Sequence, residues 1–344
     1  MRWTRWGFSC RLKPDSRVTR VESPLAPPLI HINAATTRRH LAFAPLIAAL
    51  RQMFIDGCEV PPRHIHHIID PAGAAAGTLL LMPAWRPGAR LGLKTVGIFP
   101  GNAALGQPAL HSTYLLFDAR SGEPLALIDG DEITTRRTAA ASALAASHLA
   151  RADASRLLIV GAGRVAAVMA EAMRSVRPIR EVTVWNRHSA TAAALAERLC
   201  EQGFNARATT DLEVATAQTD IVSCATLSGT PLIHGAWLRP GTHLDLVGSF
   251  SPAMRESDAA CFARSRVYVD TPEALLKAGD VLQAIAEAAF AETDLQGTLG
   301  GLCRGECDGR QTDGERTLFK SVGTALEDLA AAEWVYERTL NDAV

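Results

Sequence analysis

The chain has 344 residues, with 35 basic and 36 acidic side chains and a net charge of −1. A near-neutral charge argues against a dedicated nucleic-acid binder. No stretch approaches the ~20 uninterrupted apolar residues that span a bilayer. The seven cysteines are odd in number and scattered, which favours reduced thiols in a cytoplasmic protein over a disulfide framework. Cys303 and Cys307 lack further ligands at zinc spacing, so we expect no metal site.

The length predicts two domains, and the first 24 residues look unlike either of them. This segment has six basic residues against Asp15 and Glu22 and shows no apolar periodicity. We interpret it as a disordered tail or an over-long start, with a targeting peptide as the alternative.

Residues 25–138 show a helix followed by short strands. Phe43, Leu46, Leu50 and Phe54 recur at helical spacing. Strands are predicted at 78–82, 91–96, 112–117 and 125–128, and the short turns between them indicate an antiparallel sheet. We therefore predict an α+β domain here.

Residues 139–316 alternate between strands and helices. We predict strands at 156–160, 181–185, 220–224, 243–247 and 266–269, helices at 164–176 and 189–200, and an alanine-rich helix at 138–149 before them. Such alternation is typical of a parallel sheet. Residues 317–344 carry a helical apolar stripe from 317 to 340 and are expected to return to the first domain. The predicted fold class is α/β, a Rossmann-type dinucleotide-binding domain plus an α+β substrate-binding and dimerisation domain completed by the C-terminal helix.

A glycine motif, Gly161-Ala-Gly163-Arg-Val-Ala166, directly follows the first strand of this region and opens a helix. Gly161 allows a tight turn, and Gly163 lets the backbone approach a pyrophosphate at the helix N-terminus. Arg164 and Val165 belong to the same predicted site. The structural alternative is a strand–turn–helix that holds no nucleotide.

The end of the next strand bears on the choice of nucleotide. NAD sites usually place a carboxylate there for the ribose hydroxyls, whereas this chain has Trp185-Asn186-Arg187. Arg187 could pair with a 2′-phosphate, so we predict NADPH. If Arg187 is an ordinary surface arginine, NADH stays open.

Three further segments carry a family resemblance: Leu91–Asn102 with Lys94, Asp129–Ser142 with Arg137, and Leu318-Phe-Lys-Ser-Val-Gly323. Together with the glycine motif they resemble the ornithine cyclodeaminase/mu-crystallin family over roughly residues 28–338. The segment from His243 to Glu256 is most similar to the Δ1-pyrroline-2-carboxylate reductase branch.

The resemblance implies roles for particular residues. Arg63, Lys94 and Arg137 would hold the substrate carboxylate, which suits a planar guanidinium and a lysine; a surface salt bridge is the alternative for each. Further contacts implied by the resemblance are Thr226, Val247, Gly248, Ser249 and Ser321 for the cofactor and Val322 for the substrate. Core packing is the alternative for Val247 and Val322.

The departures from the family bear on the reaction. Where cyclodeaminases carry an aspartate after the Val-Gly segment this chain has Phe250, and Ala109 stands where they tend to have a threonine. Phenylalanine cannot accept a proton, which disfavours deamination and leaves reduction of a preformed cyclic imine. His111 is the candidate proton donor, with a merely nearby histidine as the alternative, and His64, His66 and His67 could help to shape the pocket.

The predicted function is NAD(P)H-dependent reduction of Δ1-pyrroline-2-carboxylate to L-proline, with Δ1-piperideine-2-carboxylate and L-pipecolate as a second pair. The alternatives are an ornithine cyclodeaminase-type lyase and a mu-crystallin-like binding protein without turnover. The apolar strands of the first domain exceed what two helices can cover, so we expect a homodimer. The alternative is that the loop 61–77 covers that sheet.

Overall fold

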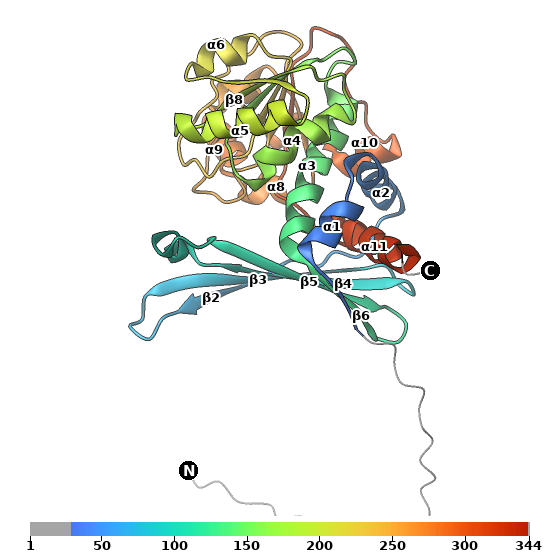
Figure 1. Ribbon diagram of the computed structural model, residues 1–344. Coiled ribbons are helices and arrows are strands. Elements are labelled where there is room, and N and C mark those ends of the chain that lie inside the picture. The colour runs from blue at the N-terminus through green and yellow to red at the C-terminus, as the bar shows by residue number, and fades with distance from the viewer. Residues whose placement is uncertain (1–28, 343–344) are drawn as a thin grey trace, which may run out of the picture.

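The computed structural model describes residues 29–342, which form two lobes that each contain one β-sheet (Figure 1). The segment interpreted as a tail, residues 1–24, lies outside the described residues. No helix in the described part of the chain is long and apolar enough to cross a membrane. Within residues 29–342, no three His, Cys, Asp or Glu side chains are grouped so that they could hold a metal ion.

The smaller sheet has six strands. In spatial order they are β1 (Ile30–Ile32), β6 (Pro124–Asp129), β5 (Leu110–Asp118), β4 (Arg90–Ile98), β3 (Ala75–Trp85) and β2 (His64–Ile69). β1 pairs with β6 in parallel, and every other pairing is antiparallel. The four predicted strands are confirmed with longer bounds. The prediction missed β1, which has three residues, and β2, whose six residues are all exposed and show no buried alternation.

Residues of the central strands alternate between the two faces of this sheet. On β4, Gly92, Lys94 and Val96 are buried while Leu91 and Leu93 are half-buried. The alternation in burial arises because helices lie against only one face of this sheet, as Figure 1 shows. The helices of this lobe are α1 (Ala34–His40), α2 (Phe43–Asp56), α11 (Ala325–Asp342) and the first turns of α3 (Gly130–Leu149), beside a short 3-10 helix at Pro100–Leu105.

The larger sheet has eight strands, all parallel. In spatial order they are β13 (Leu295–Thr298), β12 (Arg266–Val269), β14 (Thr317–Lys320), β11 (His243–Leu246), β10 (Ile221–Cys224), β7 (Arg156–Val160), β8 (Glu181–Trp185) and β9 (Asn205–Ala208). The connecting helices are α4 (Arg164–Arg174), α5 (Ser189–Glu201), α6 (Leu212–Ala217), α7 (Ala260–Ala263), α8 (Glu273–Lys277), α9 (Gly279–Ala286), α10 (Leu299–Arg304) and a 3-10 turn at Glu292–Asp294.

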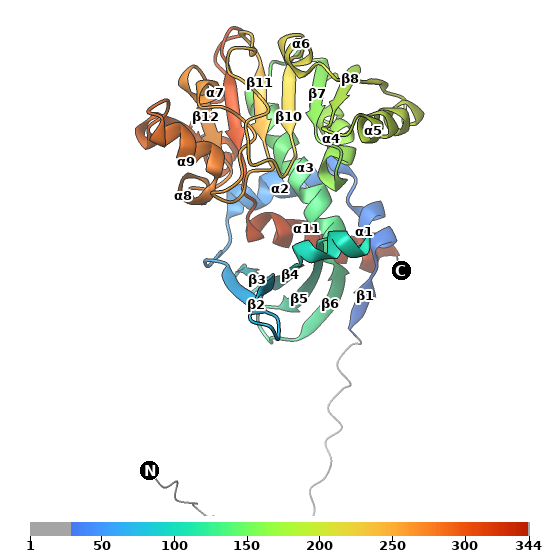
Figure 2. The same ribbon diagram turned by 90° about the vertical axis from the view of Figure 1, so that its left-hand side faces the viewer.

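Helices cover both faces of the larger sheet, as Figure 2 shows. Alternate residues of β7 therefore enter different cores. Leu157 and Ile159 belong to the core that also contains residues of α4 and α5, whereas Leu158 and Val160 belong to the core that contains residues of α8 and α9. This burial on both sides explains the continuous apolar run of β7 and confirms the predicted Rossmann-type α/β fold.

The structure differs from the predicted organisation in two details. Residues 317–320, predicted as the start of the C-terminal helix that returns to the first domain, form β14 between β11 and β12 of the larger sheet. Their four residues are all buried, which periodicity alone cannot distinguish from a buried helix. The predicted boundary at residues 138/139 falls inside α3, one continuous helix that joins the lobes.

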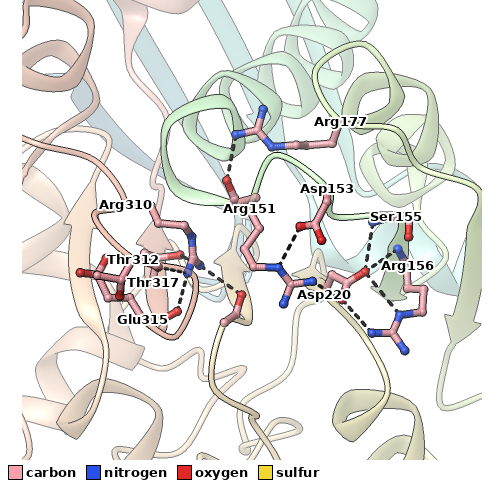
Figure 3. Close-up of polar contacts among 12 residues, drawn as sticks. Arg151, Asp153, Ser155, Arg156, Arg177, Asp220, Arg310, Thr312, Glu315 and Thr317 are labelled. Carbon is pink, nitrogen blue, oxygen red and sulfur yellow. Dashed lines mark hydrogen bonds and ion pairs between the residues drawn. The ribbon is translucent and has the colours of Figure 1, made fainter.

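The C-terminal end of α3 is anchored at the amino ends of the parallel strands (Figure 3). Arg177 donates to the carbonyls of Ser147 and Ala150, each at 2.9 Å, and Arg310 Nε donates to that of Leu149 at 2.7 Å. These arginines satisfy the free carbonyls of the last helical turn. They hold the axis of α3, and with it Arg137, relative to the larger sheet.

Candidate active site

Two adjoining cavities of about 320 and 290 Å³ lie at the carboxyl ends of the neighbouring strands β7 and β10, where the strand order of the sheet reverses. In open α/β sheets, ligands bind at this switch point. Among the predicted residues, the first cavity is lined by Arg137, Gly163, Arg164, Val165, Thr226, Val247, Gly248, Ser321 and Val322. The second is lined by Gly161, Gly163, Asn186, Arg187 and Thr226. Leu110 of the smaller sheet also lines the first cavity, which therefore lies between the lobes.

The glycine turn leaves room for a ligand beside its backbone. Gly161 has φ +116°, and a Cβ there would lie 2.5 Å from the carbonyl oxygen of Ala225. Gly163 caps the N-terminus of α4, and a Cβ there would meet nothing within 4 Å. The absence of a side chain at Gly161 is thus required by the fold, whereas at Gly163 it opens space over the unpaired amides of α4.

A buried carboxylate, which the sequence analysis missed, links the two loops beside the cavities. Glu256 accepts hydrogen bonds from Thr226 N at 2.6 Å, Thr226 Oγ1 at 2.8 Å and Gly248 N at 2.7 Å. A Cβ on Gly248 would lie 1.9 Å from the carbonyl oxygen of Thr226. These contacts set the distance between the loops that follow β10 and β11.

The prediction that Ser249 contacts the cofactor is not supported by its position. Its side chain is fully buried, donates to the carbonyl of Met254 at 2.8 Å and accepts from Asp280 N at 3.2 Å. Ser249 is absent from the lining of both cavities. The hydroxyl instead fixes the turn that follows Gly248.

A cluster of four buried charges lies behind the wall of the first cavity. Arg137 donates from Nη1 to Glu327 Oε2 at 2.5 Å and from Nε to Asp328 Oδ1 at 2.9 Å. Lys94 Nζ lies 2.6 Å from Asp328 Oδ2. The side chains of Glu327 and Asp328 are 0% exposed, that of Lys94 2% and that of Arg137 7%. Of the four residues, only Arg137 lines the cavity.

Burial changes the proton affinities within this four-residue cluster. Burial raises the pKa of Glu327 to about 7, against the opposing effect of Arg137. Burial lowers the pKa of Lys94 to about 8, which the attraction of Asp328 only partly offsets. Although burial opposes ionisation of Asp328 as well, Arg137 and Lys94 hold the pKa of that carboxyl below its usual value. Glu327 is therefore the carboxyl of the cluster that titrates near neutrality.

Arg63 lies beside the cavity loop rather than in the cavity lining. It donates from Nη2 to the carbonyl of Gly323 at 2.8 Å and lies 3.3 Å from Glu273 Oε2. Asp270 holds the same loop from the other side by accepting from Val322 N and Gly323 N at 2.7 and 2.6 Å. Because Gly323 lines the first cavity, Arg63 contacts the cavity wall without lining the cavity itself.

His111 does not line the cavity, because successive side chains of a strand point to opposite faces of the sheet. Leu110 lines the first cavity, whereas His111 is exposed and shares the outward parity of Thr113 and Leu115 on β5. The position of His111 within this subunit therefore does not support its predicted role as proton donor. The histidines of β2 (His64, His66 and His67) are likewise exposed along the sheet edge and line neither cavity.

The sequence analysis did not identify Glu327 and Asp328, although a signal was present. The two acids stand between Leu326 and Leu329, on the apolar stripe of α11 that faces the sheet. Buried acids on an apolar stripe require cationic partners. The lysine and arginine already singled out, Lys94 and Arg137, are those partners.

Comparisons with known proteins agree with this geometry. Residues 33–343 match the ornithine cyclodeaminase/mu-crystallin family. The Delta(1)-pyrroline-2-carboxylate reductase of Paracoccus denitrificans is 40% identical over 312 residues, covering 90% of this chain and 96% of that protein. The structure of the Thermococcus litoralis Delta(1)-pyrroline-2-carboxylate reductase, in complex with NADH and L-proline, superposes with a TM-score of 0.86 at 31% identity, covering 92% of this chain and 99% of the other.

A second similar structure is an archaeal alanine dehydrogenase dimer with bound NAD. It has a TM-score of 0.85 at 28% identity and covers 92% of this chain and 97% of the other. The fold therefore occurs in dinucleotide-dependent enzymes that differ in substrate. The chain belongs to the ornithine cyclodeaminase/mu-crystallin family.

Proposed function

We propose that this protein is an oxidoreductase that reduces Δ1-pyrroline-2-carboxylate to L-proline, and Δ1-piperideine-2-carboxylate to L-pipecolate, with NADPH or NADH. The observation that carries the proposal is a single buried arginine, Arg137, that lines an otherwise largely apolar cavity next to the glycine turn. A small cyclic acid needs one strong carboxylate partner and an apolar wall for its ring. The relatives described above support the same substrate class.

The residues around the two cavities fit a nicotinamide dinucleotide. The pyrophosphate would lie over the amides of Gly163 and Arg164, in the space that a side chain at position 163 would fill. Asn186 and Arg187 would hold the adenosine ribose, and Val247 and Gly248, which line the first cavity after β11, would contact the nicotinamide. When bound, the dihydronicotinamide supplies the hydride, and the protein supplies orientation and charge.

The chain's own residues would bind and orient the imine. Arg137 pairs with the substrate carboxylate, and Asp328 holds the guanidinium in place. Lys94 stabilises Asp328 from behind rather than reaching the cavity, so in this proposal it acts as a positioning residue. Such orientation is the main contribution that a hydride transfer requires from a protein.

Phe250 favours reduction over ammonia elimination. It lines the first cavity with 40% of its surface exposed. In the described structure no Asp or Glu lines this cavity, so a carboxylate that could move protons during ring closure is missing from its wall. The aromatic ring instead adds apolar surface suited to a five- or six-membered ring.

The test is a cofactor-oxidation assay with both cyclic imines, run beside an ammonia assay with L-ornithine. We expect oxidation of the reduced nicotinamide with the imines and no ammonia from ornithine. Binding of NADPH without turnover of either imine would favour the binding-protein alternative, and ammonia release would favour the lyase.

The choice of NADPH rests on Arg187. We expect Arg187→Ala to raise the Michaelis constant for NADPH by roughly ten- to hundredfold, the effect of a lost charge-assisted hydrogen bond, and to leave that for NADH nearly unchanged. Arg198→Ala, an exposed arginine of α5 outside both cavities, is the matched control. Equal effects of Arg187→Ala on the two cofactors would show that this arginine does not read the 2′-phosphate.

We also propose a homodimer formed through the outer face of the smaller sheet. Pro83, Leu93, Leu115 and Leu127 form one row across β3, β4, β5 and β6, and all four are half-buried. No described helix lies against this face (Figure 1). The loop 61–77 does not cover it, because residues 64–69 of that loop form β2 and extend the sheet edge. An apolar row of this kind is an association surface.

Sedimentation at micromolar concentration tests the dimer. Wild type should sediment at twice the chain mass, and Leu115→Lys should shift it to one chain mass because a lysine is placed in the apolar row. Leu276→Lys on α8, where the leucine is 75% exposed, should leave the dimer intact. Wild-type protein that sediments as a single chain would rule out the dimer.

A further inference from the structure

The bond between Arg137 and Glu327 competes with the role of Arg137 in binding. A guanidinium grips a carboxylate best through two parallel N–H groups. Here Nε is engaged by Asp328, and Nη1 is engaged by Glu327 at 2.5 Å. The remaining edge packs on the backbone of Gly323, where a Cβ would lie 2.7 Å from Nη1 and 2.9 Å from Nη2. Glu327 therefore occupies a donor that a substrate carboxylate would use.

The environment of Glu327 stabilises its ionised form poorly. Its Oε2 is held by Arg137, but Oε1 is buried and has no hydrogen-bond partner among the described residues. Asp270, which follows β12, and the adjacent Asp328 both repel its negative charge. An ionised carboxylate with one bare oxygen in such surroundings has a strong tendency to take up a proton.

The charges within the four-residue cluster balance only while no anion is bound. The cations are Arg137 from α3 and, through Asp328, Lys94 from β4. The four-residue cluster is neutral when Glu327 and Asp328 are both ionised. A substrate carboxylate on Arg137 would add an uncompensated negative charge to a buried site that Asp270 already makes more negative, and protonation of Glu327 would remove that excess.

We propose that Glu327 is a positioning residue that couples proton uptake to substrate binding: one proton from solvent adds to its carboxylate, and Arg137 is thereby released to bind the substrate carboxylate. The inference rests on the proposed function of Arg137. The proton returns to solvent when the product leaves and Arg137 again pairs with Glu327. The pKa of Glu327, raised by burial to about 7, places this exchange near neutral pH.

The sign of the pH dependence follows directly. At pH below the pKa of Glu327 in the free protein, the proton is already present and affinity for the carboxylate does not change with pH. At higher pH each bound anion must recruit a proton, so the dissociation constant rises about tenfold per pH unit. Substitution of Glu327 by glutamine, which is neutral at every pH, should remove the rise.

The test uses pyrrole-2-carboxylate, a planar ring carboxylate whose nitrogen does not titrate near neutrality, added to the protein saturated with oxidised nicotinamide dinucleotide. Calorimetry in two buffers of different ionisation enthalpy counts the protons taken up. We expect uptake to approach one proton per site above pH 7 and to vanish in Glu327→Gln. That variant should also bind the anion more tightly than wild type at alkaline pH, whereas a merely structural role would weaken binding at every pH.

Glu333→Gln is the matched control, because Glu333 is a buried acid of the same helix, α11, that pairs with Arg86 away from the cavities. It should keep the wild-type uptake. Uptake that persists in Glu327→Gln would assign the proton to Asp270 or Lys94 and overturn the proposal. Wild-type binding without uptake at any pH would overturn it even if the variant does not fold, while the reductase function would stand. Failure of wild type to bind the anion at all would instead overturn the carboxylate site.

Discussion

Replacement of Arg137 by methionine should lower kcat/KM with Δ1-pyrroline-2-carboxylate roughly thousandfold, which corresponds to about 4 kcal/mol. The side chain is the carboxylate partner in the cavity wall, and its loss also leaves Glu327 and Asp328 buried without their shared cation. Breaking a buried ion pair from one side costs about 3–5 kcal/mol of stability. Steady-state kinetics and chemical denaturation measure the two losses separately.

Arg136 provides the control for this experiment. It is the preceding residue of α3 and is buried to a similar degree, but it donates to the carbonyl of Leu41 and stacks over the ring of Phe43 at 4.2 Å. Arg136→Met should destabilise the protein while the folded fraction keeps a normal Michaelis constant. A wild-type Michaelis constant in Arg137→Met would show that the substrate carboxylate binds elsewhere.

Substitution of Gly248 by alanine should be the most damaging single-methyl change near the cofactor cavity. Its Cβ would lie 1.9 Å from the carbonyl oxygen of Thr226 and 2.5 Å from Glu256 Oε1, two groups that the Glu256 hydrogen bonds hold in place. Because the loops cannot separate without breaking those bonds, we expect a loss of about 1–3 kcal/mol of stability, as for other overpacked sites. Dinucleotide affinity should fall with it, since both loops line the cavity.

Gly163→Ala separates the two effects. A Cβ at position 163 meets nothing within 4 Å, so the free protein should unfold near the wild-type temperature. The methyl group would occupy the space proposed for the pyrophosphate, so cofactor affinity should still fall. Thermal unfolding without cofactor and a fluorescence titration with NADPH report the two quantities. Wild-type thermal stability in Gly248→Ala, or wild-type affinity in Gly163→Ala, would contradict this account of the turn.

Much of the cofactor region could be predicted because its signals are local. Strands β7, β8 and β12 have the predicted bounds, since each is a short apolar or β-branched run beside a clear turn. The six residues of the glycine motif are enough to predict a dinucleotide site, because a strand, a tight turn and a helix N-terminus are adjacent in the chain. Such features depend on backbone preferences and neighbouring side chains, which a single sequence displays.

The tertiary structure alone decided which chemically suitable residues reach the cavity. The partners Lys94, Arg137 and Asp328 come from a strand, the connecting helix and the C-terminal helix, and no local pattern links positions so far apart in the chain. Strand parity, which reverses the direction of the side chain at every residue, leaves Leu110 and not His111 in the cavity lining. The sequence by itself determined the fold class and the cationic residues available. The pairing of those cations with Glu327 and Asp328 depended on how α11 packs against the sheet. A charged side chain can be buried only where the packing brings it a partner of opposite charge.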